Sequence, residues 1–284
     1  MEKILITGAY GQLGSEVKDI SQSFPTATFT YTDRDDLDIT DVDAVVRFIA
    51  EGKFTTLINC AAYTAVDKAE SEKEVAQAIN GTAAGILAKA CKDANAKFVH
   101  VSTDFVFDGT IARPLLEDDA VNPLSVYGST KLDGEKLVLA NNPDALIIRT
   151  SWVYSSFGNN FVKTVLRLCK ERESLNIIFD QIGTPTYAKD LARAILEIAT
   201  GKEWKSGLYH YSNEGVASWY DFAIAIRDIA GLKTPIYPIE TSQYPTPAVR
   251  PKYSVLNKKK FKDTFKISIP YWRDSLVNCM QIIK

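Results

Sequence analysis

The stretch Lys3-Ile4-Leu5-Ile6-Thr7-Gly8-Ala9-Tyr10-Gly11-Gln12-Leu13-Gly14 decides the fold of this chain. It joins a short apolar run to three glycines spaced GxxGxxG, and an amphipathic segment follows. The first glycine permits a sharp turn, the second lets a pyrophosphate approach the backbone, and the third lets helix and strand pack closely. The phosphates then meet the positive end of the helix dipole. The stretch predicts a dinucleotide site; a glycine-rich turn without a ligand is the alternative.

The first half of the chain alternates strand-like runs with helix-like segments. The strands are expected at 3–7, 27–31, 55–60, 97–102 and 145–149, and the helices at 12–21, 41–51, 71–93 and 126–141. Several runs are continuously apolar, as expected for strands covered on both faces. Asp41, and Ser71 with Glu74 three residues on, are the predicted helix caps. The pattern predicts an α/β fold with a doubly wound parallel sheet of the Rossmann type.

The regular alternation of strand-like and helix-like segments ends after Arg149. Helices are expected at 161–171, 187–200, 218–230 and 271–282, and five prolines between 234 and 251 predict an extended surface loop. We expect residues 1–150 to form an NAD(P)-binding domain and residues 151–284 a smaller, mainly substrate-binding α/β domain. The helix near 187–200 is expected to pack back on the first domain, with the ligand cleft between the two.

Composition narrows the class of protein. The net charge of −2 over 284 residues offers no general field for nucleic acid or a membrane surface. The apolar run after Met1 is too short for a signal peptide, and no stretch reaches the roughly 18 apolar residues of a transmembrane helix. Four scattered cysteines and two histidines make a zinc site or a disulfide framework unexpected. We therefore expect a cytoplasmic protein with no bound metal.

Two candidate groups extend the cofactor site and supply its chemistry. Asp33 after the second strand would bind ribose hydroxyls and favour NAD, whereas the adjacent Arg34 would favour the 2′-phosphate of NADP; a solvated turn is the alternative, and we favour NADPH. Tyr127 and Lys131 are four residues apart on one helical face, where the ammonium would lower the pKa of the phenol. Thr103 ends an apolar strand, where ligands sit in such sheets. Standing alone, the Tyr–Lys spacing would more often mark a surface pair.

These motifs carry a family resemblance that covers nearly the whole chain. The GxxGxxG loop and the YxxxK pair resemble those of the extended short-chain dehydrogenase/reductases. Within that family the chain is most similar to the branch that reduces dTDP-4-dehydro-L-rhamnose to dTDP-L-rhamnose for cell-surface polysaccharide. The matching stretches are NCAAYTAVDKAE (59–70), STDFVFDG (102–109), PLSVYGSTK (123–131), RTSWVY (149–154), GNNF (158–161), DQ and GTPT within 180–186, and RP (250–251).

The resemblance implies a role for each candidate residue. Tyr127 would protonate the C4 oxygen of the keto sugar while NAD(P)H delivers hydride, Lys131 would hold the nicotinamide ribose, and Thr103 would be the third catalytic residue. Substrate contacts are implied for Thr103, Asp104, Trp152 and Arg250. The implied cofactor-binding residues are Gly8, Tyr10, Gly11, Gln12, Leu13, Gly14, Asp33, Arg34, Asp38, Ile39, Ala61, Ala62, Tyr63, Val101, Tyr127 and Lys131.

Some of these roles have alternatives. Trp152 is either a platform for the sugar or nucleotide or a core aromatic residue, and Arg250 either binds the substrate diphosphate or forms a surface salt bridge. Some family members are dimers bridged by Mg²⁺ through glutamates. Here Glu16 matches one position but Lys189 takes the other, and an ammonium repels a cation. We expect a monomer or weak homodimer without bridging magnesium.

Two kinds of rival function use the same scaffold: another nucleotide-sugar enzyme and a regulatory subunit. A 4,6-dehydratase needs a second carboxylate after the threonine, but Phe105 follows Asp104, and a 4-epimerase would keep its NAD tightly bound. A non-catalytic NADP-binding regulatory subunit would have no need of an acid such as Tyr127.

Overall fold

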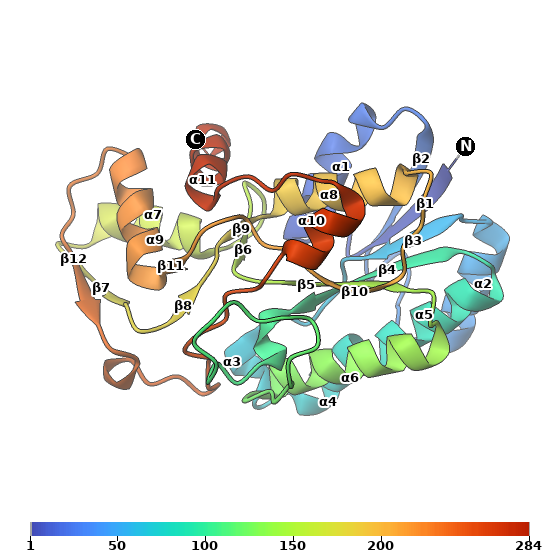
Figure 1. Cartoon of the computed structure of the whole chain (residues 1–284), viewed down its shortest axis with the longest axis horizontal. Helices are drawn as coiled ribbons and strands as arrows, with labels where there is room; N and C mark the ends of the chain where they lie inside the picture. Colours follow the sequence, from blue (N-terminus) through green and yellow to red (C-terminus); the bar gives the residue numbers. More distant parts are fainter. Residues whose placement is uncertain (1, 284) are drawn as a thin grey trace.

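A six-stranded parallel sheet forms the centre of the molecule. The computed structural model describes residues 2–283. The strand order is β10-β5-β4-β3-β1-β2, and all five pairings are parallel (Figure 1). The strands are β1 (Glu2–Thr7), β2 (Ala27–Thr32), β3 (Thr56–Asn59), β4 (Lys97–Thr103), β5 (Leu146–Thr150) and β10 (Gly207–His210). The predicted doubly wound sheet is confirmed.

Helices cover both faces of this sheet, and the alternation of strand side chains explains how. Ile4 and Ile6 pack with α1 (Gln12–Ile20) and α8 (Ala188–Thr200), while Leu5 between them packs with α2 (Val42–Gly52) and α5 (Ala83–Asp93). Successive side chains of a strand point to opposite faces, so a continuous apolar run contributes side chains to a core on each face of the sheet. The long helix α6 (Val126–Asn141) adds Val138 to the second core.

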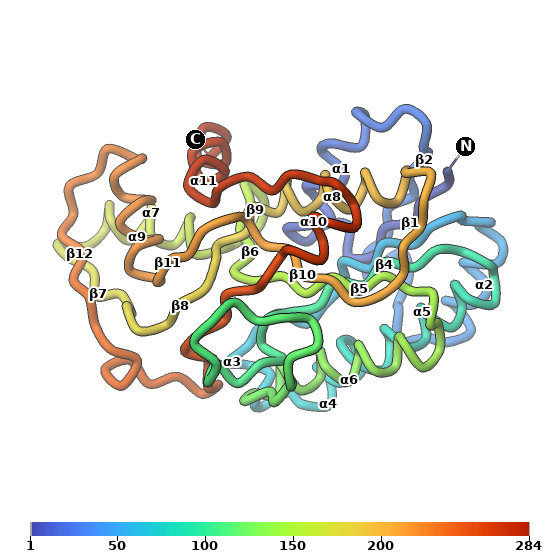
Figure 2. Tube along the Cα trace, viewed as in Figure 1, coloured from blue at the N-terminus to red at the C-terminus, as the bar shows by residue number. Residues whose placement is uncertain are grey.

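The sixth strand comes from the second half of the chain. β10 pairs with β5, and α8 shares a buried core with α1. Figure 2 shows the chain leaving the sheet after β5, returning through α8 and β10, and leaving again toward α9 (Trp219–Ile229). The sequence carried no apolar run long enough to mark β10. The division at residue 150 into two domains stays a prediction.

The helix predicted over 71–93 is confirmed from Lys73 to Asp93, with a π-helical turn inside it. It contains α4 (Lys73–Ala76), a π-helical turn (Gln77–Thr82) and α5, with a short α3 (Val66–Ala69) before it. The capping box at Ser71 is wrong: Glu72 is the N-cap without a side-chain bond, and the Ser71 hydroxyl donates to the carbonyl of Lys68. The Asp41 cap is confirmed, because its Oδ1 accepts the N–H of Ala44 at 3.0 Å.

The remaining part of the chain surrounds a separate core. It is built by α7 (Phe161–Glu171), α9 and α11 (Trp272–Ile282) beside the parallel pair β7 (Leu175–Ile178) and β12 (Ile236–Ile239). β12 lies inside the segment predicted as a loop, and Pro238 belongs to it. Proline is tolerated there because β12 has one neighbour and its other edge is free. The other elements are β6 (Val153–Tyr154), β8 (Ile182–Gly183), β9 (Thr186–Tyr187), β11 (Ala217–Ser218) and α10 (Lys259–Phe265).

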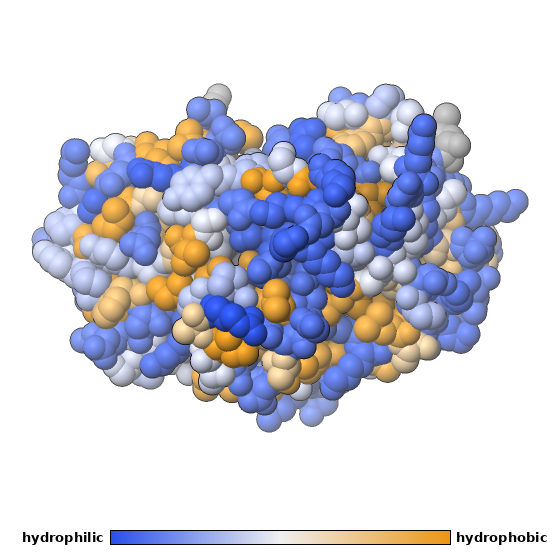
Figure 3. Space-filling view, in the orientation of Figure 1, coloured by the Kyte–Doolittle hydropathy of each residue, from blue (hydrophilic) through white to orange (hydrophobic). Residues whose placement is uncertain are grey.

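The surface is mixed in character. Hydrophilic residues gather over α10 on the face seen in Figure 3, with smaller apolar areas around them. Among residues 2–283, no helix combines the length and the apolar character that crossing a bilayer requires.

Candidate active site

The glycine turn between β1 and α1 accepts no side chain at two of its three glycines. Gly8 has a φ of +65°, and a Cβ added there would lie 2.6 Å from the backbone of Ala61. A Cβ on Gly14 would lie 2.3 Å from the carbonyl oxygen of Gly8. The Gly11 N–H donates to that same oxygen at 3.1 Å, which closes the turn. The first and third glycines therefore act as the spacing predicts: one turns the chain and the other lets α1 approach β1.

The N-terminus of α1 suits the pyrophosphate of a dinucleotide. Gly11 is its N-cap and has no side chain to occupy the first N–H groups, and no acidic residue lies in the first turn. Free N–H groups and the positive end of the dipole favour an anion here. The residues present thus fit a nicotinamide dinucleotide.

A pocket of about 560 Å³ opens beside this turn. It lies where β1, β2 and β3 end, the edge at which parallel sheets bind ligands. Eight of the predicted cofactor residues line it: Gly8, Gly11, Asp33, Arg34, Asp38, Ile39, Ala61 and Ala62.

The other predicted cofactor residues next to the turn lie elsewhere. Leu13 and Gly14 are buried against the sheet, and the Gln12 side chain accepts a hydrogen bond from Asn160. Tyr10 is exposed, and the Tyr63 hydroxyl donates to Glu72 at 2.7 Å. Sequence reasoning missed the wall opposite the glycine turn, which comes from the first turns of the helix over 73–93. Its residues are Glu74, Val75, Ala78 and Ile79.

Asp33 and Arg34 have different surroundings. The Asp33 carboxylate accepts the backbone N–H groups of Tyr10 and Arg34, at 3.2 and 2.8 Å, so it holds the glycine turn against β2. Arg34 is exposed at the pocket, and its side chain forms no ion pair within residues 2–283. The guanidinium is therefore exposed at this end of the pocket, where its charge helps to lower the pKa of Asp38 beyond the effect of the Thr40 hydrogen bonds.

The catalytic candidates meet where β4 ends and α6 begins. Thr103 is the last residue of β4, and Tyr127 lies in the first turn of α6, which Ser125 caps through the N–H of Gly128. A Cβ on Gly128 would lie 2.3 Å from the carbonyl oxygen of Phe105, so this glycine lets α6 approach the segment after β4. The Tyr127 ring packs edge-on against Phe105, with centroids 5.4 Å apart. The structure thus brings Tyr127 beside Thr103.

The predicted effect of Lys131 on Tyr127 is wrong. Burial raises the pKa of Tyr127 to about 12; the Asp104 charge adds to the shift and a hydrogen bond with Thr103 opposes it. The Lys131 ammonium instead donates to the carbonyl oxygen of Val101 at 2.6 Å. Val101, predicted as a cofactor residue, therefore anchors the lysine. Burial lowers the pKa of Lys131 to about 8.

Asp104 is a buried carboxylate that can accept a further hydrogen bond. Its Oδ1 accepts the Thr103 hydroxyl at 3.1 Å, while its Oδ2 has no partner among the described residues. Burial raises the pKa of Asp104 to about 6. A buried acceptor without a donor is costly, so this oxygen suits a ligand that carries hydroxyl groups.

The two remaining substrate candidates are engaged within the protein. The Trp152 ring stacks on Trp219 with centroids 3.7 Å apart and lies against Gly183, which has no room for a Cβ. Arg250 forms two bonds to Asp67 on α3, at 3.0 and 2.8 Å. Arg250 therefore forms the salt bridge that was its alternative, whereas Trp152 is half-buried in an aromatic stack and is not part of the core.

The comparisons with known proteins agree with this geometry. The family of the RmlD substrate binding domain matches residues 1–284. A dTDP-4-dehydrorhamnose reductase of Aggregatibacter actinomycetemcomitans is 42% identical over 98% of both chains. The crystal structure of a dTDP-4-dehydrorhamnose reductase of Clostridium acetobutylicum superposes with a TM-score of 0.95 at 44% identity, over 99% of each chain. The chain belongs to this reductase family. That of Bacillus anthracis, solved in complex with NADP, gives a TM-score of 0.95 at 37% identity, over 99% of each chain.

The two positions considered for a bridging metal are both engaged within the chain. Glu16 is buried and accepts the Ser155 hydroxyl at 2.6 Å, and Lys189 pairs with Asp19 at 2.8 Å. Residues 2–283 contain no cluster of three or more histidine, cysteine or acidic side chains that could hold a metal. The oligomeric state stays a prediction.

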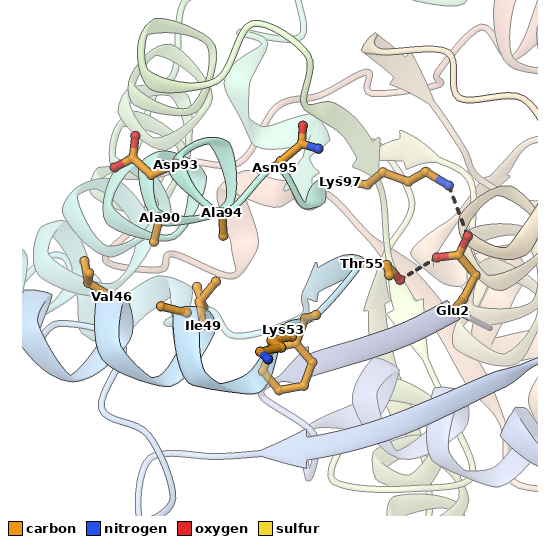
Figure 4. Close-up of a pocket in the computed structure, with 12 residues that line it drawn as sticks. Glu2, Val46, Ile49, Lys53, Thr55, Ala90, Asp93, Ala94, Asn95 and Lys97 are labelled. Atoms are coloured by element: carbon orange, nitrogen blue, oxygen red, sulfur yellow. Dashed lines mark hydrogen bonds and ion pairs between the residues drawn. The ribbon is translucent and has the colours of Figure 1, made fainter.

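A second pocket, of about 650 Å³, lies at the opposite edge of the sheet (Figure 4). Its walls come from α2 and α5 and from the starts of the strands. Glu2 there accepts the Thr55 hydroxyl and lies 3.6 Å from Lys97. None of the catalytic candidates of the reductase family reaches it, so the chemistry belongs to the opposite edge.

Proposed function

We propose that this chain reduces the C4 keto group of dTDP-4-dehydro-L-rhamnose to give dTDP-L-rhamnose, with NADPH as the cofactor. The observation that carries the proposal is that Tyr127 packs against Phe105, two residues after Thr103, at the carboxyl edge of the sheet that also bears the glycine turn. The relatives named dTDP-4-dehydrorhamnose reductase supply the substrate. The place of action is proposed to be the cytoplasm.

The proton in this reaction comes from the chain itself. When bound, the dihydronicotinamide supplies a hydride. Tyr127 donates its hydroxyl proton to the C4 oxygen. The Thr103 hydroxyl, which donates to Asp104 in the structure, would turn to donate a hydrogen bond to the same C4 oxygen and orient it. With a pKa raised to about 12, Tyr127 is fully protonated at neutral pH. The alkoxide formed at C4 is more basic than a phenolate, so the proton moves toward the sugar.

Lys131 and Asp104 position the reactants. An ammonium has three donors, and the Val101 carbonyl takes one, which leaves two for the ribose hydroxyls of the nicotinamide. The unpartnered Oδ2 of Asp104 is proposed to accept a sugar hydroxyl. A guanidinium suits phosphate oxygens, so Arg250 is proposed to exchange Asp67 for the substrate diphosphate. Trp152, stacked on Trp219, would form the wall beside the sugar.

Arg34 supports NADPH as the preferred cofactor. The competing carboxylate of Asp33 is engaged by two backbone N–H groups, whereas the guanidinium is exposed at the pocket. A 2′-phosphate carries negative charge and would meet Arg34 there.

The test is NADPH oxidation, followed by absorbance, with dTDP-4-dehydro-L-rhamnose as the substrate. UDP- and GDP-linked 4-keto sugars are the matched comparisons. Rapid oxidation with the dTDP sugar alone would support the proposal. Turnover confined to a UDP or GDP sugar would refute the substrate and leave the reductase chemistry in place. NADP binding without turnover of any sugar would favour a regulatory subunit.

A further inference from the structure

A line of buried polar side chains runs from β1 to the catalytic lysine. The Thr7 hydroxyl donates to Oδ1 of Asn59 at 2.7 Å, and Nδ2 of Asn59 lies 3.1 Å from Nδ1 of His100. Nε2 of His100 lies 3.5 Å from Nζ of Lys131. All four side chains are at most 2% exposed. They lie on β1, β3, β4 and α6 in turn, so the line crosses half the sheet.

The direction of the line is fixed by a backbone group. The Ala61 N–H donates to Oδ1 of Asn59 at 3.1 Å, and a backbone N–H can only donate. Oδ1 therefore faces Ala61 and Thr7, which leaves the amide NH₂ of Asn59 facing His100. This NH₂ can only donate, so Nδ1 of His100 must be the acceptor and carry no proton.

This assigns the tautomer of His100. A neutral imidazole carries one proton, and with Nδ1 as an acceptor that proton is on Nε2. The ring is neutral because burial, together with the Lys131 charge, lowers the pKa of His100 well below its ordinary value. The Nε2–H then faces Nζ of Lys131, where it opposes an ammonium and suits the lone pair of a neutral amine.

We propose that His100 is a positioning residue that sets the protonation of the catalytic lysine, because Asn59 fixes the ring proton of His100 on the nitrogen facing Lys131. This assignment rests on the proposed function, in which Lys131 holds the nicotinamide ribose as an ammonium. Ala61, which orients Asn59, also lines the cofactor pocket, so the wall of that pocket and the lysine share one network.

Other titratable groups surround the lysine and act in known directions. Tyr127 lies one turn before Lys131 on α6 and Glu135 one turn after it. The Glu135 charge favours the ammonium. It is paired with Arg149 on β5 at 2.7 Å, which moderates this effect. On β4, the Nε2–H of His100 acts against the ammonium.

The first test is the tautomer, which requires no turnover. The protein has two histidines, His100 and His210, so a long-range ¹H–¹⁵N spectrum of the whole chain contains the ring signals of these two residues. Nδ1 of His210 lies 3.1 Å from the carbonyl oxygen of Leu115, so His210 must carry its proton on Nδ1. The spectrum should show one ring of each tautomer, and the His210→Asn variant identifies which signal remains. An Nδ1–H tautomer at His100, or a charged ring at neutral pH, would overturn the proposal.

The second test is the pH profile of kcat/KM. His100→Asn keeps an acceptor for Asn59 and deletes the Nε2–H, so Lys131 should stay charged to higher pH. We expect the alkaline limb to move up by about one pH unit. His210→Asn, which keeps a donor to Leu115, is the control and should leave the limb in place.

A second variant guards against misfolding of the first. Asn59→Asp places an acceptor opposite Nδ1, which moves the ring proton there and exposes a lone pair to Lys131; its alkaline limb should also move up. An unmoved limb in both variants, with NADPH binding retained, would refute the role of His100. If no keto sugar is turned over, the tautomer result still decides the geometry, so failure of the two proposals can be told apart.

Discussion

Replacing Arg149 by methionine tests how the sheet supports the catalytic end of β4. Arg149 and Glu135 are each 3% exposed, and two hydrogen bonds of 2.9 and 2.7 Å join the guanidinium to the carboxylate. The Ser102 hydroxyl, next to Thr103, donates to the same carboxylate. Removing Arg149 leaves a buried carboxylate with one donor. Breaking such a pair costs about 3–5 kcal/mol of unfolding free energy.

The assay is urea unfolding at pH 7, followed by circular dichroism. With a slope of about 3 kcal/mol per molar urea, the midpoint of Arg149→Met should fall by more than about 1 M. The double variant Glu135→Leu/Arg149→Met removes both charges and should recover most of the loss. Arg167→Met breaks an exposed pair with Glu171 and should cost under about 0.5 kcal/mol. A loss in Arg149→Met as small as in this control, or no recovery in the double variant, would refute the reasoning.

Three further predictions concern the cofactor turn and the substrate site. Gly14→Ala should weaken NADPH binding at least tenfold by fluorescence titration, because its Cβ would lie 2.3 Å from the oxygen of Gly8; unchanged affinity would contradict the turn geometry. Arg34→Ala should raise the KM for NADPH about tenfold and leave the KM for NADH unchanged. An equal rise in both KM values would show that Arg34 does not select between the two cofactors. Asp104 has a folded pKa raised from 3.8 to about 6, so the wild type should lose about 2 kcal/mol of unfolding free energy as the pH rises from 4 to 6. Asp104→Asn should lack this loss, and an identical pH dependence in both proteins would exclude Asp104 as its source.

The sequence predicted the elements whose signals are local. The glycine spacing predicted the turn at Gly8 because a backbone with positive φ that lies this close to Ala61 requires glycine. Most of the first five strands were found because they are apolar runs buried on both faces. The edge strand β2 differs, because threonines alternate with apolar residues along it and most of its residues are half-buried. Tyr127 and Lys131 were found because helical spacing is readable in the chain.

The features that were missed depend on contacts between distant segments. β10 is a sheet strand because it pairs with β5, and β12 because it pairs with β7, and neither pairing leaves a local pattern. The effect of Lys131 on Tyr127 was predicted wrongly because helical spacing does not say which acceptor an ammonium reaches, and here the Val101 carbonyl is closer. The pairing of Arg250 with Asp67 joins residues 183 positions apart.

The most direct test of the account is Tyr127→Phe, which removes one hydroxyl and keeps the ring against Phe105. Two quantities are measured: the Kd for NADPH and the single-turnover rate of NADPH oxidation with dTDP-4-dehydro-L-rhamnose. We predict an unchanged Kd and a rate lower by about a hundredfold or more. A variant that oxidises NADPH at the wild-type rate would show that the proton reaches the sugar from another group.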